Sequence, residues 1–284
     1  MKGYKGFEPG LICRGKQYAE NTVFEEEEAE ICSCGMHFCE NPFDVLGYYG
    51  FTNDNGDFNE FAEVEALDEV KTDDNRKFCT KKLKIGAKLS ISKFINACVD
   101  FAIEKTSTCI ADNKISSGDF AQIGSSGDFA QIGSSGDSAR IGSSGDSAKI
   151  GSSGDSAKIG SSGDFAQIGS SGNSAKIGSS GDFAQIGSSG NSAQIGSSGD
   201  SAKIGSSGDS AKIGSSGKDC VICCAGHNSV VKAKKGSWIT LAEWEYSEEK
   251  ERYIPKCVKT EFVDGERIKE DTLYKLIDGE FVEV

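Results

Sequence analysis

Residues 123–131 read Ile-Gly-Ser-Ser-Gly-Asp-Phe-Ala-Gln, and this nonapeptide recurs with almost no drift from Ile115 to Gly217. A repeat of fixed length is typical of a solenoid, in which each unit buries its apolar residues against its neighbours. A flexible Gly/Ser linker needs no fixed apolar residue, yet Ala-x-Ile appears in all eleven units. The alternation of Ala, Gln or Lys, and Ile predicts a short strand with Ala and Ile inward. Gly-Ser-Ser-Gly predicts the corner between strands.

The variable positions of the repeat indicate how many units form one coil. If two units close a coil, residues 18 apart in the sequence stack on each other. One side of the coil then carries Phe129, Ser147, Phe165, Phe183 and Ser201, and the other carries Phe120, Ser138, Ser156, Ser174, Ser192 and Ser210. Asn173 and Asn191, which replace the aspartate of the repeat, both fall on the second side. We therefore expect a two-sided parallel β-solenoid with 18 residues per coil, whose roughly five to six coils form a rod about 25–30 Å long.

Residues 1–106 have an ordinary globular composition and predict an α+β head domain. Alternating apolar residues predict three strands, at Cys34–Cys39, Glu60–Leu67 and Lys81–Ile85. The spacing of apolar residues in Ser90–Ala102 predicts an amphipathic helix. Asn41 followed by Pro42 is typical of a helix start, which predicts a second helix that continues through Tyr49.

The frame of the repeat continues beyond the perfect units and then gives way to a small β cap. Cys220 takes the Ala position and Ile222 the Ile position, so the cysteines of residues 220–224 are interpreted as packing residues and not as a metal cluster. Two Asp-Gly pairs, Asp264-Gly265 and Asp278-Gly279, predict hairpin turns. A cap is expected because the open edge of a solenoid would pair with other chains. We place the domains at residues 1–106 (head), 107–241 (solenoid) and 242–284 (cap).

Composition and charge exclude several classes of function. The chain has 284 residues, 11 cysteines and a formal net charge of -13. No stretch approaches the roughly 18 apolar residues of a membrane span, and the start lacks the apolar core of a signal peptide. We therefore expect a cytoplasmic protein with reduced thiols and no membrane contact. The acidity is greatest in residues 1–114, with 14 basic and 21 acidic side chains, which makes direct nucleic-acid binding an unfavourable interpretation.

The outward positions of the repeat supply candidate partner-binding residues. If Ala and Ile point inward, Phe129, Phe165 and Phe183 form an exposed aromatic row, and such rows usually meet a partner. The glutamines that accompany them are Gln131, Gln167 and Gln185. We expect a second copy of the chain or a different protein to cover this row. The aspartate of the repeat is expected to fix the corner through its short side chain, and calcium binding at these corners is left open.

Six short segments, four in the head and two after the perfect repeats, form a further pattern: Tyr4–Phe7, Cys13–Gly15, Cys34–Pro42, Glu63–Glu65, Lys235–Ile239 and Val263–Lys269. Together they resemble an uncharacterised family that is common in bacteriophage and prophage genomes. Members of this family often carry Gly/Ser-rich repeats after the N-terminal domain. The resemblance implies a viral setting in the cytoplasm of a bacterial host and no established activity.

A second resemblance implies an enzymatic alternative for the head. A Tyr-Lys-Gly strand, then a Gly-x-His-Phe strand that runs into a helix with two tyrosines, is similar to the order found in ADP-ribosyltransferases. It implies a head site with Tyr4, His37, Cys39 and Tyr49. Such enzymes also need a late glutamate, which the sequence does not place.

A zinc site in the same segment is disfavoured. Its ligands would be Cys32, Cys34, His37 and Cys39, and four ligands within eight residues crowd one tetrahedral ion. We predict no metal and no cofactor.

These observations favour a non-enzymatic, phage-type interaction protein that uses a rigid solenoid for docking or self-assembly. Its concrete form is the inhibition of a host defence nuclease through acidic mimicry of nucleic acid. The alternative is a nucleotide-using transferase in the head, with the repeat as its scaffold.

Overall fold

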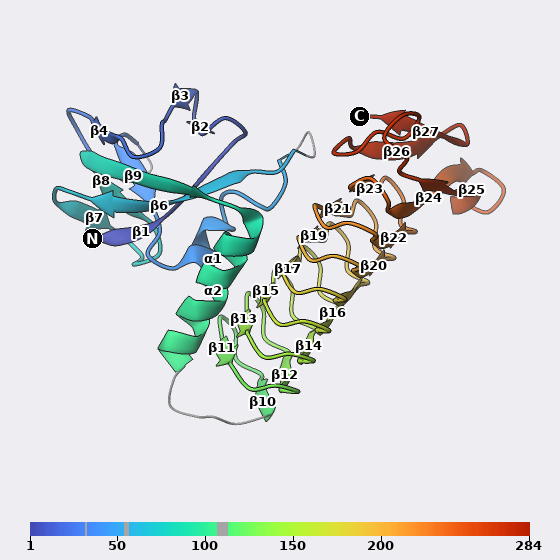
Figure 1. The fold of residues 1–284 in the computed structure, drawn as a ribbon, viewed down its shortest axis with the longest axis horizontal. Helices are drawn as coiled ribbons and strands as arrows, with labels where there is room; N and C mark the ends of the chain where they lie inside the picture. Colours follow the sequence, from blue (N-terminus) through green and yellow to red (C-terminus); the bar gives the residue numbers. More distant parts are fainter. Residues whose placement is uncertain (32, 54–56, 107–112) are drawn as a thin grey trace.

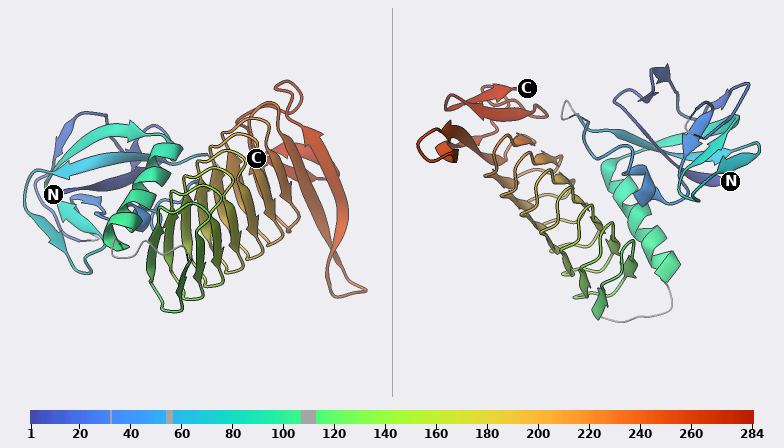
Figure 2. Two further views of the ribbon diagram at one scale, coloured as in Figure 1. Left: turned by 60° about the horizontal axis from the view of Figure 1, so that its bottom comes forward. Right: turned by 180° about the vertical axis from the view of Figure 1, so that it is seen from behind.

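The computed structural model describes residues 1–31, 33–53, 57–106 and 113–284, which form three parts (Figure 1). A small α+β head comes first, a parallel β-solenoid of about seven turns spans residues 114–241, and two antiparallel hairpins follow it. Helix α2, Ile91–Thr106, lies along one side of the solenoid, so the head meets the rod sideways (Figure 2). The predicted fold class, with 18 residues per coil, is confirmed.

The head is built on two small sheets. A four-stranded antiparallel sheet has the order β1-β6-β9-β4, a three-stranded sheet has the order β5-β8-β7, and β2 and β3 form a hairpin. The strands are β1 Lys2–Phe7, β2 Ile12–Cys13, β3 Lys16–Gln17, β4 Val23–Glu25, β5 Met36–Phe38, β6 Glu60–Ala66, β7 Val70–Thr72, β8 Phe78–Thr80 and β9 Lys82–Leu89. The rings of Phe61 on β6 and Phe94 on α2 stack with centroids 3.9 Å apart, which fixes the helix to the sheet. No helix in the described part of the chain is long and apolar enough to cross a membrane.

Helix α1, Pro42–Val45, starts as predicted and ends early. The N–H of Phe43 donates to the side chain of Asn41 at 3.0 Å, and Pro42 occupies the first turn. The prediction that the helix continues through Tyr49 was wrong. Gly47 is a poor helix former, and its N–H donates to the carbonyl of Asp44 three residues back, so the segment tightens into turns.

The solenoid consists of two sheets that take alternate repeat units. The first, which we call the open sheet, contains β10 Asn113–Ser116, β12 Gln131–Ser134, β14 Lys149–Ser152, β16 Gln167–Ser170, β18 Gln185–Ser188, β20 Lys203–Ser206, β22 Val221–Cys224, β24 Trp238–Ser247 and β25 Arg252–Phe262. The second, the head-side sheet, contains β11 Gln122–Ser125, β13 Arg140–Ser143, β15 Lys158–Ser161, β17 Lys176–Ser179, β19 Gln194–Ser197, β21 Lys212–Ser215, β23 Val230–Lys232, β26 Tyr274–Ile277 and β27 Glu280–Glu283. The strands are parallel as far as β24 in the open sheet and β23 in the head-side sheet, and the antiparallel strands β25, β26 and β27 extend the sheets at the C-terminal end. Each residue of the perfect repeat pairs with the residue 18 further on, as between Ile141 and Ile159.

The strand of each unit is Gln/Lys/Arg-Ile-Gly-Ser, so the corner begins two residues later in the unit than predicted. The Ala, Ile and first Ser positions of the unit point inward, and Ala139, Ile141 and Ser143 are each 0 % exposed. Gly142 between them points outward, because successive side chains of a strand alternate between faces. The prediction that Gly-Ser-Ser-Gly forms the corner was therefore wrong. The first Gly and Ser belong to the strand, and the chain bends at Ser-Gly-Asp-Phe/Ser.

The corners are held by the aspartate of the repeat. The Oδ1 atom of Asp146 accepts the backbone N–H of Asp164, 18 residues on, at 2.9 Å, and Asn173 accepts from Asn191 in the same way. The next residue adopts a left-handed conformation, with φ of 56° at Phe165. A Cβ on Gly145, just before Asp146, would overlap the carbonyl of Gly127 in the preceding coil. The side-chain hydrogen bond supports the interpretation of the aspartate as a corner residue.

The first coil departs from the repeat frame. Ile115 pairs with Gly133 and Lys114 with Ile132, so Ile115 occupies the outward glycine position and is 89 % exposed. The repeat frame therefore does not begin with Ile115 as an inward residue. The reason is that Ile115 is followed directly by Ser-Ser-Gly, which is one glycine short of a full unit.

The cap closes the C-terminal end of the solenoid core. Cys220, Ile222 and Cys224 take the three inward positions of the coil before it, with 0 % exposure, and burial raises the pKa of the Cys224 thiol to about 12. Asp278 and Gly279 both have positive φ between β26 and β27, as in a type I′ hairpin. The prediction of a hairpin turn at the other pair, Asp264-Gly265, was wrong. Asp264 instead accepts three backbone N–H groups in the connection from β25 to β26.

Candidate docking surfaces

The head-side sheet binds helix α2 through the glycines of the repeat. A Cβ on Gly142 would lie 2.9 Å from Cβ of Ala102 and 3.1 Å from Cα of Val99. One coil further on, a Cβ on Gly160 would lie 3.5 Å from Cγ2 of Val99, and two coils further on a Cβ on Gly178 would lie 2.9 Å from Cγ1 of Ile95. Because glycine has no side chain, the helix packs directly on the backbone of the sheet.

Cationic side chains of the same sheet fix the head beside the helix. Arg140 forms a buried ion pair with Asp44, the Nζ of Lys158 donates to the carbonyl of Phe43 at 3.0 Å, and Lys176 donates to the carbonyl of Leu46. Burial lowers the pKa of Lys158 to about 8. Each cation of the head-side sheet named here therefore has its acceptor in the head.

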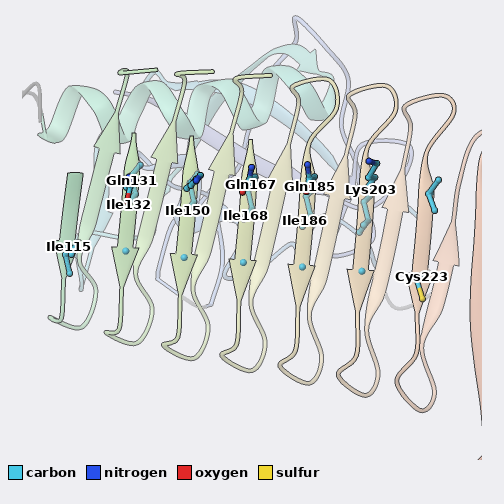
Figure 3. A pocket seen from close by; sticks show the side chains of 18 residues that line it. Ile115, Gln131, Ile132, Ile150, Gln167, Ile168, Gln185, Ile186, Lys203 and Cys223 are labelled. Atoms are coloured by element: carbon cyan, nitrogen blue, oxygen red, sulfur yellow. The ribbon is translucent and has the colours of Figure 1, made fainter. Parts of the chain in front are cut away.

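The open sheet presents the same repeat positions without a helix on them. A Cβ on the glycines at positions 151, 169, 187 and 205 would meet nothing within 4 Å. A groove of about 1040 Å³ runs along these glycines, bordered by the Gln and Lys side chains of successive coils (Figure 3). Lys149 and Lys203 are exposed there, and neither side chain forms a hydrogen bond or ion pair within the described residues. This surface is a vacant counterpart of the α2 site.

The predicted aromatic row lies at the corner that leads into the open sheet. Phe129, Phe165 and Phe183 are 73, 54 and 50 % exposed. The rings of Phe165 and Phe183 stack with centroids 5.0 Å apart, whereas Ser147 occupies the coil between Phe129 and this pair. The accompanying Gln131, Gln167 and Gln185 border the groove of the open sheet (Figure 3). The row is thus a stacked pair and one separate ring beside the groove.

The head contains a second concave site. Tyr4, His37, Cys39 and Tyr49, which the sequence grouped, line one cavity of about 600 Å³. Burial raises the pKa of Cys39 to about 12, which keeps it a neutral thiol and a poor nucleophile. Among the described residues, the glutamate that lines the cavity is Glu26, whereas Glu63 and Glu65 on β6 do not line it. Sequence reasoning missed Lys5 and Arg14, which also line it, although Lys5 alternates with apolar residues on β1.

The described residues contain no cluster of side chains that could bind zinc. No group of three or more His, Cys, Asp or Glu side chains that could hold a metal ion occurs in residues 1–31, 33–53, 57–106 and 113–284. Cys32 lies outside the described residues, while Cys34 and His37 line the head cavity.

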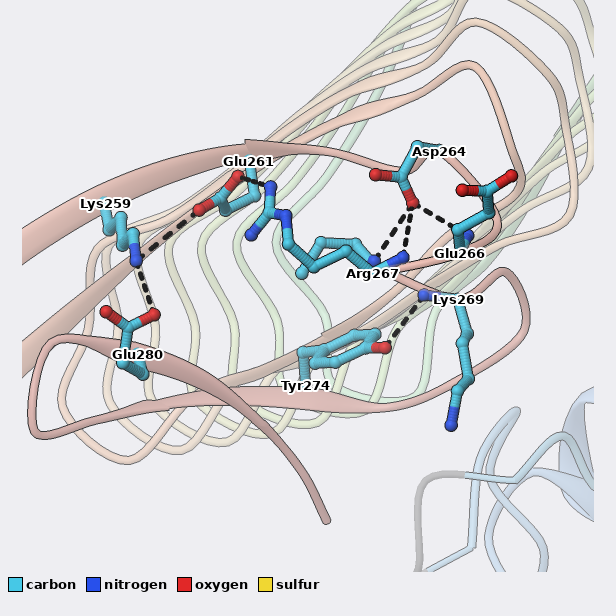
Figure 4. Close-up of polar contacts among 9 residues, drawn as sticks. Lys259, Glu261, Asp264, Glu266, Arg267, Lys269, Tyr274 and Glu280 are labelled. Atoms are coloured by element: carbon cyan, nitrogen blue, oxygen red, sulfur yellow. Dashed lines mark hydrogen bonds and ion pairs between the residues drawn. The ribbon is translucent and has the colours of Figure 1, made fainter.

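The charged residues of the cap serve its own structure. Lys259 bonds to Glu280 at 2.6 Å and lies 3.5 Å from Glu261, which also pairs with Arg267 (Figure 4). The hydroxyl of Tyr274 accepts the backbone N–H of Lys269 at 2.9 Å. These internal pairs leave the cap a weaker candidate for binding than the open sheet.

The head matches one family model. Residues 1–97 match a family described as "Domain of unknown function (DUF7666)". No curated protein and no solved structure significantly matches the chain. The resemblance of the N-terminal segment to an uncharacterised family is therefore confirmed for the head, up to the middle of α2. A domain of unknown function joined to a β-solenoid scaffold fits a non-enzymatic structural or interaction role.

Proposed function

We propose that the chain is a non-enzymatic interaction scaffold whose open sheet binds an amphipathic helix of a partner protein. The observation that carries the proposal is the binding of α2 by the opposite sheet. The same repeat positions face outward on both sheets, and one set already holds a helix against its glycines. An uncovered, largely apolar groove that runs over several coils is typical of an interaction surface.

The geometry of α2 defines the helix that would fit. Coils lie about 4.8 Å apart and a helical turn rises about 5.4 Å, so residues three and four apart in a helix meet successive coils. Ala102, Val99 and Ile95 do this on the head-side sheet. The partner helix needs small or β-branched residues at the same spacing. Lys149 and Lys203, three coils or about 14 Å apart, select carboxylates about nine to ten residues apart in that helix.

A second copy fits this groove less well than a different protein. An antiparallel twofold pairing of two open sheets, centred between Gln167 and Gln185, would place Lys149 opposite Lys203 of the other copy. Like charges that face each other across an interface are destabilising. The charge pattern therefore favours a heterologous partner.

We also propose that the setting is a bacteriophage-infected bacterial cytoplasm, with a host protein as the partner. The support is the resemblance of the end segments to a family common in phage genomes. Nucleic-acid mimicry is less well supported as the mode of binding. In the acidic run of residues 25–28, Glu25 pairs with Lys82 at 3.0 Å and Glu26 pairs with Lys16 at 2.6 Å.

A fluorescent peptide of residues 90–106, which carries the sequence of α2, tests the groove directly. We expect the peptide to bind the full chain and to lose binding when Gly169 and Gly187 are both changed to Val, because the added methyl groups fill the groove. The double variant should melt at the temperature of the wild type or above it, since a Cβ at these positions meets nothing within 4 Å and replacing glycine in a strand reduces the backbone freedom of the unfolded chain. A peptide with Ala102→Lys is the matched control and should not bind. Absence of peptide binding, or binding that survives the double change, contradicts the proposal.

A further inference from the structure

The cavity of the head carries positive charge inside an acidic domain. Four cationic side chains line it, and one carboxylate, Glu26, accompanies them. The cations are Lys5, Arg14, Lys16 and Lys77. Lys16 is neutralised by Glu26, with its Nζ 2.6 Å from the carboxylate. The excess of positive charge is local, because the segment around it is the most acidic part of the chain.

Lys5 is the central cation of this cavity. It is only 5 % exposed, and its Nζ donates to the carbonyl of His37 at 2.8 Å and to the Sγ of Cys13 at 3.3 Å. Within the described residues, its ammonium forms no ion pair with a carboxylate. A buried ammonium without a counter-ion is costly, and burial accordingly lowers the pKa of Lys5. An ammonium has three N–H donors, so one remains for an anion in the cavity.

Arg14 approaches the same cavity from the tip of the β2–β3 hairpin. Arg14 and Gly15 have φ of 51° and 75°, the two positive values of a type I′ turn. This turn fixes the backbone of Arg14 beside Cys13. Arg14 is exposed, and its guanidinium has no ion-pair partner in the described chain. Its N–H donors are therefore available to an anion.

Aromatic rings form the wall next to these cations. Tyr48, Tyr49 and Phe38 line the cavity, and Tyr48 is 53 % exposed. Gly6 on β1 allows Tyr49 to approach, since a Cβ there would lie 2.7 Å from the Cβ of Tyr49. The hydroxyl of Tyr49 donates to the Sγ of Cys13 at 3.1 Å, which holds its ring in place. Rings beside cations suit a ligand that is flat at one end and anionic at the other.

We infer that the head cavity binds a small organic anion that carries a flat ring. Its phosphate or carboxylate meets Lys5 and Arg14, and its ring lies against Tyr48 and Tyr49. The volume of about 600 Å³ is ample for such a molecule. This binding function is separate from the open sheet, because the two surfaces share no residue.

His37 reports on the cavity directly. The chain has two histidines, and the other, His227, stacks on Tyr253 beside the cap with ring centroids 4.4 Å apart. The pKa of His37 is lowered by burial and then by Lys5, Lys77 and Arg14. A bound anion offsets these cations and should raise the pKa of His37. Nuclear magnetic resonance of the two imidazoles therefore gives a site signal and an internal control from one sample.

The titration uses the full chain at low salt with four probes: adenosine diphosphate, benzoate, pyrophosphate and adenosine. We expect the two ringed anions to shift His37 saturably and to leave His227 unmoved. Tighter binding of adenosine diphosphate identifies a phosphate ligand, and tighter binding of benzoate identifies a carboxylate ligand. Pyrophosphate should bind about tenfold more weakly than adenosine diphosphate, because it lacks the ring, and adenosine should not shift His37. If none of the three anions shifts His37 at a concentration of about 10 mM, the inference is overturned.

A charge variant separates the site from general electrostatics. Arg14→Gln should weaken binding of the tighter anion about tenfold, since a charge-assisted hydrogen bond is lost. The exposed position of Arg14 makes this variant safe for folding. Lys250→Gln, in the β24–β25 turn, removes one exposed charge elsewhere and should leave the affinity unchanged. Equal affinity of the Arg14 variant and the wild type would also overturn the inference, whatever the outcome for the open sheet.

Discussion

Gly142→Ala and Gly151→Ala form a matched pair that tests the role of glycine in binding α2. The two glycines are nine residues apart, occupy the same position of the repeat, and follow Arg-Ile and Lys-Ile. Gly142 lies beneath α2, where a Cβ would be 2.9 Å from Cβ of Ala102 and 3.1 Å from Cα of Val99. Gly151 lies on the open sheet, where a Cβ would meet nothing within 4 Å.

The matched positions allow the steric cost to be isolated. Both changes remove the backbone freedom of a glycine in a strand, which stabilises each variant by about 0.5–1 kcal/mol. Only Gly142→Ala also forces a methyl group against the backbone of a packed helix, which costs about 1–3 kcal/mol. The free energy of unfolding of the two variants should therefore differ by about 1–3 kcal/mol, with Gly151→Ala as stable as the wild type or more so.

Thermal unfolding followed by circular dichroism measures this difference, which corresponds to melting temperatures about 2–10 °C apart. Hydrogen exchange should show faster exchange in α2 for Gly142→Ala alone, since the helix must move away from β13 and β15. Equal melting temperatures and equal protection of α2 would refute the argument that the repeat glycines of the head-side sheet are there to seat the helix.

Three further predictions concern charge and self-association. The pKa of Lys158 is about 8 in the folded chain and ordinarily near 10.5. Between these values the unfolded chain binds more protons than the folded chain, so the free energy of unfolding rises with pH. Relative to Lys158→Met, the wild type should gain about 1–2 kcal/mol of stability between pH 7.5 and 9.5, measured by urea titration. Asp164→Asn keeps the corner hydrogen bond and removes one negative charge from a stack of carboxylates. It should therefore raise the free energy of unfolding by about 0.3–1 kcal/mol at low salt, and this difference should disappear near 1 M salt. A chain that self-associates through its aromatic corner should become monomeric by light scattering when Phe129, Phe165 and Phe183 are changed to Ser, while an unchanged oligomer would place the contact elsewhere.

Much of the solenoid was predictable because its interactions are local and repeated. A fixed Ala-x-Ile in every unit must pack against neighbouring units, so the period determined the solenoid, and the Phe/Ser and Asp/Asn positions determined that two units close one coil. The exact corner was missed because glycine and serine occur in strands and turns alike. The decision depended on the side chain of the aspartate, whose acceptor role between Asp146 and Asp164 is visible only when coils are stacked.

The candidate sites were predictable in part. The sequence grouped Tyr4, His37, Cys39 and Tyr49, and the structure brings them to one cavity. It did not indicate Lys5 and Arg14, because an isolated Lys in a strand and an Arg in a turn are ordinary surface residues. Their meaning depends on burial, and burial is set by residues far along the chain, such as Tyr49 over Gly6.

The sequence by itself determined the coil, its 18-residue period and the inward Ala and Ile positions, because these depend on contacts between identical neighbours. Only the tertiary structure decided which of the two sheets is covered. Both carry the same glycines, and the choice depends on where α2 packs after the head has folded. The sequence carries a trace of that choice at the first position of each strand. Cations hold it in four of the six repeat strands of the head-side sheet (Arg140, Lys158, Lys176 and Lys212, against Gln122 and Gln194) and in two of the five of the open sheet (Lys149 and Lys203, against Gln131, Gln167 and Gln185). That trace becomes interpretable only with the head in place, because a cation and its acceptor, such as Arg140 and Asp44, are 96 residues apart in the chain.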